Sequence, residues 1–190
     1  MLKLGYKASA EQFGPRELLD FSRLAEEVGF DSVFVSDHFQ PWKHTDGHAP
    51  NSLAWLGALG ASTRRVVIGT SVATPTFRYH PSIVAQAFGT MGAMFPGRVV
   101  LGVGTGESLN EVPSTAMQWP GPKERRDRLR EAIRLINTLW TEDRVTFEGQ
   151  FYRTKDATIY DKPKQKVPIW KRPRFKGASR TPQTEAVVMK

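Results

Sequence analysis

The chain has 190 residues, of which 39% are hydrophobic and 11% aromatic, a composition typical of a folded domain and not of a disordered chain. The lack of cysteine excludes disulfides and thiolate catalysis, and no apolar run reaches the length of a membrane span. The sequence also shows no charged-then-apolar secretory leader, so we expect a soluble cytoplasmic protein with no membrane partner.

The formal net charge of +8 comes entirely from the end of the chain. Residues 1–161 contain 18 Lys and Arg against 18 Asp and Glu, whereas residues 162–190 contain nine basic residues against Glu185 alone. A basic tail can bind polyanions through phosphate contacts, but a short run of charge is more often simply solvated. We therefore do not expect the chain to bind nucleic acid.

The first two thirds of the chain predict strands and helices in alternation. Buried strands are expected from apolar runs at 2–7, 31–36, 66–70 and 98–103. Helices are expected from apolar residues at helical spacing over 15–28, 52–61 and 81–94, and again from about residue 124. Because no antiparallel pattern occurs early in the chain, this order indicates a parallel α/β fold.

The last part of the chain departs from this alternation. Residues 145–153 predict a small hairpin that turns at Glu148 and Gly149, and Val167–Trp170 has the pattern of a fifth strand. The residues that follow show no strand, helix or repeat period. We expect them to form a poorly ordered basic tail.

The second strand runs directly into Asp37, His38 and Trp42. Adjacent residues on extended backbone point to opposite faces, so Asp37 and His38 would face different parts of a ligand, with Trp42 as a flat apolar wall. The alternative is that Asp37 caps a turn, His38 is a structural histidine and Trp42 belongs to the core.

The other predicted strands also end in polar residues. The first leads to Glu11, the third to Ser71, Thr74 and Thr76, and the fourth to Thr105, Gly106, Glu107 and Asn110. In parallel α/β folds, ligands bind beyond the carboxyl ends of the strands. This convergence favours a functional role for Asp37 and His38.

The segment Gly102–Glu107 is rich in glycine, and glycine lets the backbone approach a planar or phosphorylated ligand closely. It lacks the dinucleotide fingerprint, so a simple glycine turn is an equal alternative. Glu107 is placed for proton exchange with a bound group, or else caps a turn or helix.

A metal site would need several of His38, His44, His48, Asp37 and Asp46 to converge. His44 and His48 have the spacing of a helical zinc pair, but Gly47 and two flanking prolines argue against a helix there. We therefore expect no metal. Covalent catalysis is equally unsupported, since no serine lies in a Gly-x-Ser-x-Gly motif.

Three stretches occur in an order that points to one family: residues 36–42 (SDHFQPW), 70–79 (TSVATPTFRY) and 101–107 (LGVGTGE). Together with residues 4–13 they resemble the F420-dependent glucose-6-phosphate dehydrogenases, which are luciferase-like flavin and deazaflavin enzymes. The resemblance covers residues 1 to about 170. It implies a TIM barrel, coenzyme F420 as cofactor, a sugar-phosphate substrate, and hydride transfer from C1 of glucose 6-phosphate to give 6-phosphogluconolactone.

The resemblance also assigns roles to particular residues. The deazaflavin would be contacted by Asp37, Ser71, Val72, Thr74, Thr105, Gly106 and Asn110. A non-proline cis peptide bond would join Ser71 to Val72 behind the ring. His38 and Glu107 would be the catalytic pair that handles protons, with Trp42 beside the reacting centre and Glu11 as a helper. Which of the pair is acid and which is base stays open.

Family members are nearly twice as long, so we expect this chain to be an N-terminal half, truncated after four to five strands by a shifted frame or a shortened gene. Residues 1–161 would form the partial TIM-barrel domain, and residues 162–190 the start of a fifth strand plus the tail. The residues that grip the sugar phosphate would lie in the absent half. If the chain folds, we expect a homodimer.

Two other interpretations remain open. The chain could be an F420- or FMN-dependent luciferase-like oxidoreductase that acts on another alcohol, which cofactor titration would distinguish. It could instead be a nonenzymatic fragment whose basic tail binds polyanions. The second interpretation predicts salt-sensitive retention on polyanions that disappears when residues 162–190 are removed.

Overall fold

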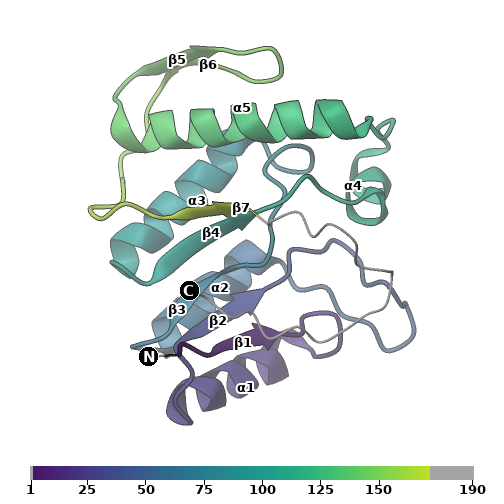
Figure 1. Cartoon of the computed structure of the whole chain (residues 1–190), viewed down its shortest axis with the longest axis vertical. Coiled ribbons are helices and arrows are strands. Elements are labelled where there is room, and N and C mark those ends of the chain that lie inside the picture. The colour runs from purple at the N-terminus through teal and green to yellow at the C-terminus, as the bar shows by residue number, and fades with distance from the viewer. Residues whose placement is uncertain (1, 172–190) are drawn as a thin grey trace.

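The computed structural model describes residues 2–171, whose central feature is a five-stranded sheet (Figure 1). In spatial order its strands are β1 (Gly5–Ala8), β2 (Ser32–Val35), β3 (Val67–Thr70), β4 (Val99–Val103) and β7 (Ile169–Lys171). Every neighbouring pair is parallel, and Val33 of β2 lies opposite Tyr6 on one side and Ile68 on the other. The predicted parallel α/β fold is confirmed, and its sheet has five strands, where a closed TIM barrel has eight.

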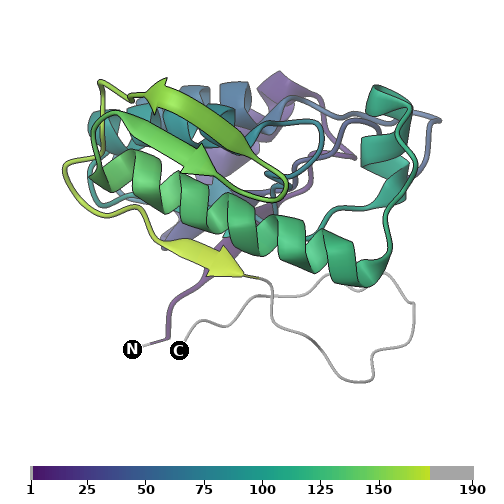
Figure 2. The same ribbon diagram turned by 90° about the horizontal axis from the view of Figure 1, so that it is seen from above.

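The long helices connect the strands and lie along one face of the sheet (Figures 1 and 2). They are α1 (Pro15–Glu27), α2 (Ser52–Ser62), α3 (Pro81–Met94) and α5 (Pro122–Thr141). A proline opens α1, α3 and α5, at a position where a backbone N–H would have no partner inside the helix. α2 begins after Asn51, whose side chain accepts a hydrogen bond from the N–H of Ala54 at 3.0 Å.

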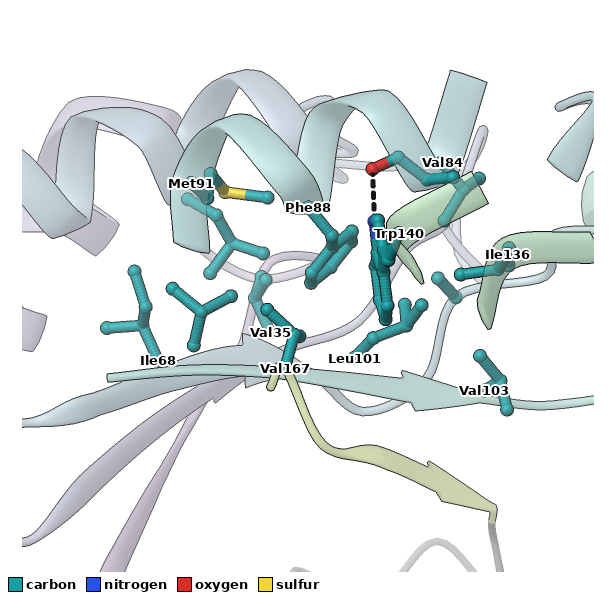
Figure 3. Packing of buried hydrophobic residues seen from close by; sticks show 14 of the residues in the cluster. Val35, Ile68, Val84, Phe88, Met91, Leu101, Val103, Ile136, Trp140 and Val167 are labelled. Atoms are coloured by element: carbon teal, nitrogen blue, oxygen red, sulfur yellow. Dashed lines mark hydrogen bonds between the residues drawn. The ribbon is translucent and has the colours of Figure 1, made fainter. Parts of the chain in front are cut away.

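The hydrophobic core fills the space between the sheet and these helices. Phe88 of α3, Leu101 of β4 and Ile136 of α5 are all 0% exposed, and Figure 3 shows them packed around Trp140. The indole N–H of Trp140 donates to the carbonyl of Ala85 at 2.8 Å, which joins α5 to α3. Each such buried side chain contributes about 2 to 3 kcal/mol. This packing holds the strands in place, so the positions from which the following loops begin are also fixed.

One helix was not predicted. Residues Ser108–Thr115 form a short helix, α4, between the predicted fourth strand and the helix predicted from about residue 124. The sequence gives no signal for α4, because Pro113 interrupts it and only Asn110 and Glu111 of the helix are buried, so it has no apolar stripe.

The predicted hairpin is confirmed and is longer than expected. β5 (Val145–Glu148) pairs antiparallel with β6 (Arg153–Ala157), and Figure 1 shows the pair lying over α5. β1 is shorter than expected, since it begins at Gly5, and Leu2 before it is 66% exposed.

The expected basic tail lies mostly outside the described residues, because these end at Lys171 in β7. Over the described range of 2–171, none of the helices is both long and apolar enough to cross a membrane.

Candidate active site

The loops that follow the strands meet at one end of the sheet. Because β1 to β4 pair in parallel, their carboxyl ends lie along one edge, at the right of Figure 1, where α4 also lies. The loop after β2 is joined to α4 by a hydrogen bond, in which the N–H of Phe39 donates to Oδ1 of Asn110 at 2.9 Å. Residues from separate strand ends therefore form one rim.

The guanidinium of Arg78, in the loop between β3 and α3, is the centre of a buried polar network at this rim. Its Nη2 donates to Oδ2 of Asp37 at 2.9 Å and to the Asp37 carbonyl at 3.0 Å. The other carboxylate oxygen of Asp37 accepts a hydrogen bond from the hydroxyl of Ser52 at 2.8 Å, at the start of α2. The Arg78 and Asp37 side chains are only 8% and 1% exposed, so water competes little for these bonds.

Glu111 of α4 is the second carboxylate beside Arg78. Its Oε2 accepts the backbone N–H of Arg78 at 3.2 Å and lies 3.5 Å from Nε. Burial raises the pKa of Glu111, against the lowering effect of Arg78. Burial alone would lower the pKa of Arg78, but Asp37 and Glu111 raise it above its usual value. One cation thus connects the loops after β2 and β3 with α4.

This network changes the interpretation of Asp37. The side chain is buried, and both carboxylate oxygens are already engaged by Ser52 and Arg78. Asp37 therefore joins the loop after β2 to Arg78 and to Ser52 at the start of α2, beneath the rim. Its predicted contact with a deazaflavin stays a prediction, and any such contact would have to share oxygens that Ser52 and Arg78 already use.

His38 points to a different partner, as the alternation of the strand predicts. Its Nδ1 lies 2.7 Å from Oε1 of Glu11, in the loop after β1. Within the described residues Nδ1 makes no aligned hydrogen bond, so its contact with Glu11 is close but not linear. Burial alone would raise the pKa of Glu11, but His38, the N–H of Trp42 and the charge of Lys7 hold it below its usual value.

Trp42 stacks on the His38 side of this pair. Its ring stacks on that of His38, with centroids 5.9 Å apart and planes 24° apart. Trp42 is 59% exposed, so it does not belong to the core as the alternative for this residue supposed. The exposed indole forms a wall beside an imidazole that is itself mostly covered.

The backbone after β3 has the predicted cis peptide bond between Ser71 and Val72. The ammonium of Lys7 in β1 donates to the carbonyl of Ser71 at 2.9 Å. The side chain of Val72 lies over Gly104, where an added Cβ would be only 2.6 Å from Val72 Cγ2. A larger residue at position 104 would push Val72 away, so the glycine permits the close approach of these two strand ends.

Gly106 needs glycine for two reasons. Its φ of +79° is rarely adopted by L side chains, and an added Cβ would be 2.9 Å from Cγ2 of Thr74. Thr74 is buried, and Thr105 and Gly106 are half-buried beside it. These three predicted cofactor residues therefore lie together, on two neighbouring loops.

Asn110 and Glu107 flank that pair of loops in different ways. Asn110 is 3% exposed, and its side-chain oxygen accepts the N–H groups of Phe39 and Gln40 at 2.9 and 3.4 Å. It fixes the loop that carries His38. Glu107 precedes α4 and is exposed, and its side chain makes no capping hydrogen bond. The carboxylate is therefore free of the capping role that was its alternative.

No group of three or more His, Asp or Glu side chains within residues 2–171 is arranged to hold a metal ion. His44 and His48 lie on an irregular loop, not on a helix. The rim therefore has the Glu11–His38 contact beside the loops after β3 and β4, whose residues 71–74 and 104–106 we name the cradle.

Sequence reasoning missed four members of the rim: Arg78, Glu111, Ser52 and Tyr79. Tyr79 receives hydrogen bonds from Arg78 Nη1 and Asn51, both at 3.2 Å. Arg78 could have been suspected, since a single charge lies in an otherwise uncharged stretch from Val66 to Met94. Glu111 gave no such signal because its helix was not predicted.

Comparison with known proteins shows which family the chain belongs to. A family model described as luciferase-like monooxygenase matches residues 2–181. The F420-dependent glucose-6-phosphate dehydrogenase of Microbacterium testaceum (strain StLB037) is 69% identical over 169 residues, 89% of this chain and 50% of that protein. The enzyme of the same name from Nakamurella multipartita is 66% identical over the same shares.

A solved structure supports the same grouping. The F420-dependent secondary alcohol dehydrogenase in complex with an F420-acetone adduct has a TM-score of 0.87 and 43% identity, over 90% of this chain and 52% of its own. The chain spans about half the length of the curated relatives it matches. Since the family model covers nearly all of a sequence that folds into parallel strands with this rim, the chain belongs to the luciferase-like monooxygenase family.

Proposed function

We propose that this chain carries the cofactor cradle and the proton-transferring residues of an oxidoreductase that transfers hydride from C1 of glucose 6-phosphate to coenzyme F420. The product is 6-phosphogluconolactone. The proposal is supported by relatives at 69% and 66% identity that are named F420-dependent glucose-6-phosphate dehydrogenases. It concerns the whole protein of that kind, of which this chain spans half. A cytoplasmic location and a homodimeric assembly belong to the same proposal.

The cradle is made of two loops that pack closely side by side. Gly104 and Gly106 lack the Cβ atoms that would strike Val72 and Thr74, so the loops after β3 and β4 can approach each other. Thr74 is buried there, and Thr105 is half-buried. Ser71, Val72, Thr74, Thr105 and Gly106 would hold the deazaflavin, with Asp37 and Asn110 fixing the loops around it.

F420, when bound, supplies the hydride acceptor, and the rim supplies the proton chemistry. Oxidation of the C1 hydroxyl requires a base for its proton. His38 can take that proton at its free ring nitrogen, Nε2, while Glu11 at 2.7 Å from Nδ1 stabilises the charged imidazole. Trp42 stacks on the imidazole and limits its contact with water. Glu107 is exposed and makes no capping hydrogen bond, so it would donate the proton that neutralises the reduced ring.

The observation that carries this proposal is the Glu11–His38 contact beside the cradle. The test is to mix the full chain with oxidised F420 and glucose 6-phosphate and to follow the loss of cofactor absorbance. A fluorescence titration with F420 alone measures binding separately. Binding that is abolished by Gly106→Val supports the cradle, and turnover that is abolished by His38→Asn supports the base. No binding by the wild-type chain would overturn the assignment of the cradle to this half.

A second candidate changes the substrate to another alcohol and leaves the cofactor open between F420 and FMN. The similarity to the F420-dependent secondary alcohol dehydrogenase, at 43% identity, favours an alcohol without a phosphate. Supplying isopropanol in place of glucose 6-phosphate, and FMN in place of F420, distinguishes the candidates. Turnover with isopropanol alone would replace the sugar-phosphate proposal.

A further inference from the structure

The chain leaves β4, forms α4 and then returns toward the sheet before α5 begins (Figure 1). Gly106 lies at the start of this segment and Trp119 near its end. A Cβ atom added at Gly106 would lie 3.2 Å from Cη2 of Trp119, so the indole packs directly against this glycine. The segment is therefore closed at its base, as in the compact surface loops that often carry functional residues. We name residues 106–119 the α4 excursion.

The α4 excursion carries three residues of the rim. Asn110 accepts the N–H of Phe39 at 2.9 Å, and Oε2 of Glu111 lies 3.5 Å from Nε of Arg78. Glu107, the proposed proton donor, precedes α4 and makes no capping hydrogen bond. The place of its carboxylate therefore depends on how the backbone at the base of the excursion is held.

Trp119 contacts two other elements at this base. Its ring lies 5.2 Å from that of Phe77, in the loop after β3, with the two planes tilted by 52°. The guanidinium carbon of Arg125 in α5 lies 4.9 Å from the centre of the indole, within the range of a cation–π contact. The half-buried indole therefore joins the loop after β3 and α5 to the start of the α4 excursion.

Arg125 also reaches the peptide unit that precedes Glu107. Its Nη1 donates to the carbonyl of Gly106 at 3.5 Å, a long and therefore weak hydrogen bond. Nε of Arg125 is buried and has no hydrogen-bond partner within residues 2–171, so the stacking on Trp119 is its stronger contact. Because the carbonyl carbon of Gly106 is bonded to the nitrogen of Glu107, the indole and the guanidinium both act on the backbone from which Glu107 projects.

We propose that Trp119 is a positioning residue for Glu107, because it closes the base of the α4 excursion against Gly106 while Arg125 holds the indole in place. The proposal rests on the role given to Glu107 in the proposed function, and it adds two residues to that site. A proton donor must keep a fixed place relative to its acceptor, since a misplacement of about 1 Å can lower a rate by about 100-fold. The alternative is that Trp119 only stabilises the fold as a whole.

The first measurement uses the full chain without cofactor or substrate. Amide hydrogen exchange, followed by mass spectrometry at pH 7, compares the wild-type chain with Trp119→Leu, Trp119→Tyr and Arg125→Met. We expect Trp119→Leu to speed exchange in residues 106–115 by about 10-fold, and Arg125→Met to speed it less. Trp119→Tyr keeps an aromatic ring at the position and should recover most of the difference. Arg134→Met is the matched control, because Arg134 of α5 lies 5.9 Å from the ring of Phe147 on the hairpin.

The second measurement is turnover with F420 and glucose 6-phosphate, corrected for the folded fraction. Trp119→Leu should lower turnover by about 10-fold or more, and Trp119→Tyr should restore most of it. Exchange in the α4 excursion that stays unchanged in Trp119→Leu would overturn the proposal. So would exchange that rises equally over the whole chain or equally in Arg134→Met, because a role in stability alone gives that result.

Faster exchange with unchanged turnover would also overturn it, since Trp119 would then hold the excursion without positioning Glu107. A wild-type chain that binds no F420 and shows no turnover would count against the proposed function. The exchange measurement would still decide whether Trp119 closes the α4 excursion, so the two failures are distinguishable.

Discussion

Arg78 and Asp37 form a buried ion pair between two loops, with Arg78 Nη2 2.9 Å from Asp37 Oδ2 and side chains that are 8% and 1% exposed. The pair lies beneath the rim and not on its surface. The same guanidinium also contacts Glu111 of α4, so removal of Arg78 would leave two buried carboxylates without a cation.

We therefore expect Arg78→Met to lower the free energy of unfolding by about 3 to 5 kcal/mol, the cost of leaving buried charges unpaired. Urea denaturation followed by circular dichroism measures the change. Arg144→Met is the control, since the ion pair of Arg144 with Asp156 is exposed and a surface pair contributes little. Equal losses in the two variants would show that the Arg78 network does not hold the rim together.

The second prediction concerns Glu11 and assumes the proposed reaction. Glu11→Gln keeps the size of the side chain but removes the negative charge 2.7 Å from His38 Nδ1. We expect turnover to fall by about 10- to 100-fold, in the range of general base effects. The affinity for F420 should change little, because no predicted cofactor residue contacts Glu11. If affinity falls and turnover does not, Glu11 belongs to binding and not to proton transfer.

Some parts of the fold could be predicted from sequence because local signals and tertiary packing agree. α3 was predicted with its observed ends, since Pro81 marks the start and apolar spacing continues to Met94. The strand ends were also located correctly, so Asp37, His38 and Thr74 were recognised as rim residues. The partners of these residues could not be predicted. Hydrogen bonds such as that from Phe39 to Asn110 join residues 71 positions apart, and no local pattern encodes them.

The third prediction concerns Tyr152 in the hairpin turn, whose hydroxyl donates to the carbonyl of Thr76 at 2.8 Å. Burial raises the pKa of Tyr152 to about 12, so the hydroxyl keeps its proton at neutral pH. Thr76 belongs to the loop that carries Thr74, and the hairpin therefore supports the cradle from outside.

We expect Tyr152→Phe to cost about 1 to 2 kcal/mol of stability and to speed amide hydrogen exchange in the Thr74–His80 loop. Urea denaturation and exchange measured by mass spectrometry check both effects. Tyr160→Phe is the control, because Tyr160 is 91% exposed and makes no hydrogen bond that would be lost. Unchanged exchange in the loop would mean that the hairpin and the cradle are independent.

The fourth prediction concerns the buried carboxylate that holds the hairpin turn against α5. Glu131 is 5% exposed and accepts the N–H groups of Gln150, Phe151 and Tyr152 at 3.0, 2.8 and 2.8 Å. Glutamine at this position would keep one acceptor and turn an N–H₂ group toward these donors. We expect Glu131→Gln to lose about 2 to 3 kcal/mol of stability at pH 7, while Glu148→Gln on the exposed hairpin edge should lose almost none.

The same carboxylate should make stability depend on pH. Burial alone would raise the pKa of Glu131, but the three N–H donors and Arg134 lower it below the usual 4.5. Because the pKa of Glu131 is lower in the folded chain, its carboxylate stabilises the fold at pH values above its pKa in the unfolded chain, near 4.5. This stabilisation is lost as the pH falls through the pKa of the folded chain. Urea titrations at steps from pH 7 to pH 3 should therefore show that the difference in free energy of unfolding between the wild-type chain and Glu131→Gln shrinks below about pH 4.5. A gap between the two chains that stays constant over this range would mean that hydrogen bonds to the charged form of Glu131 do not hold the turn.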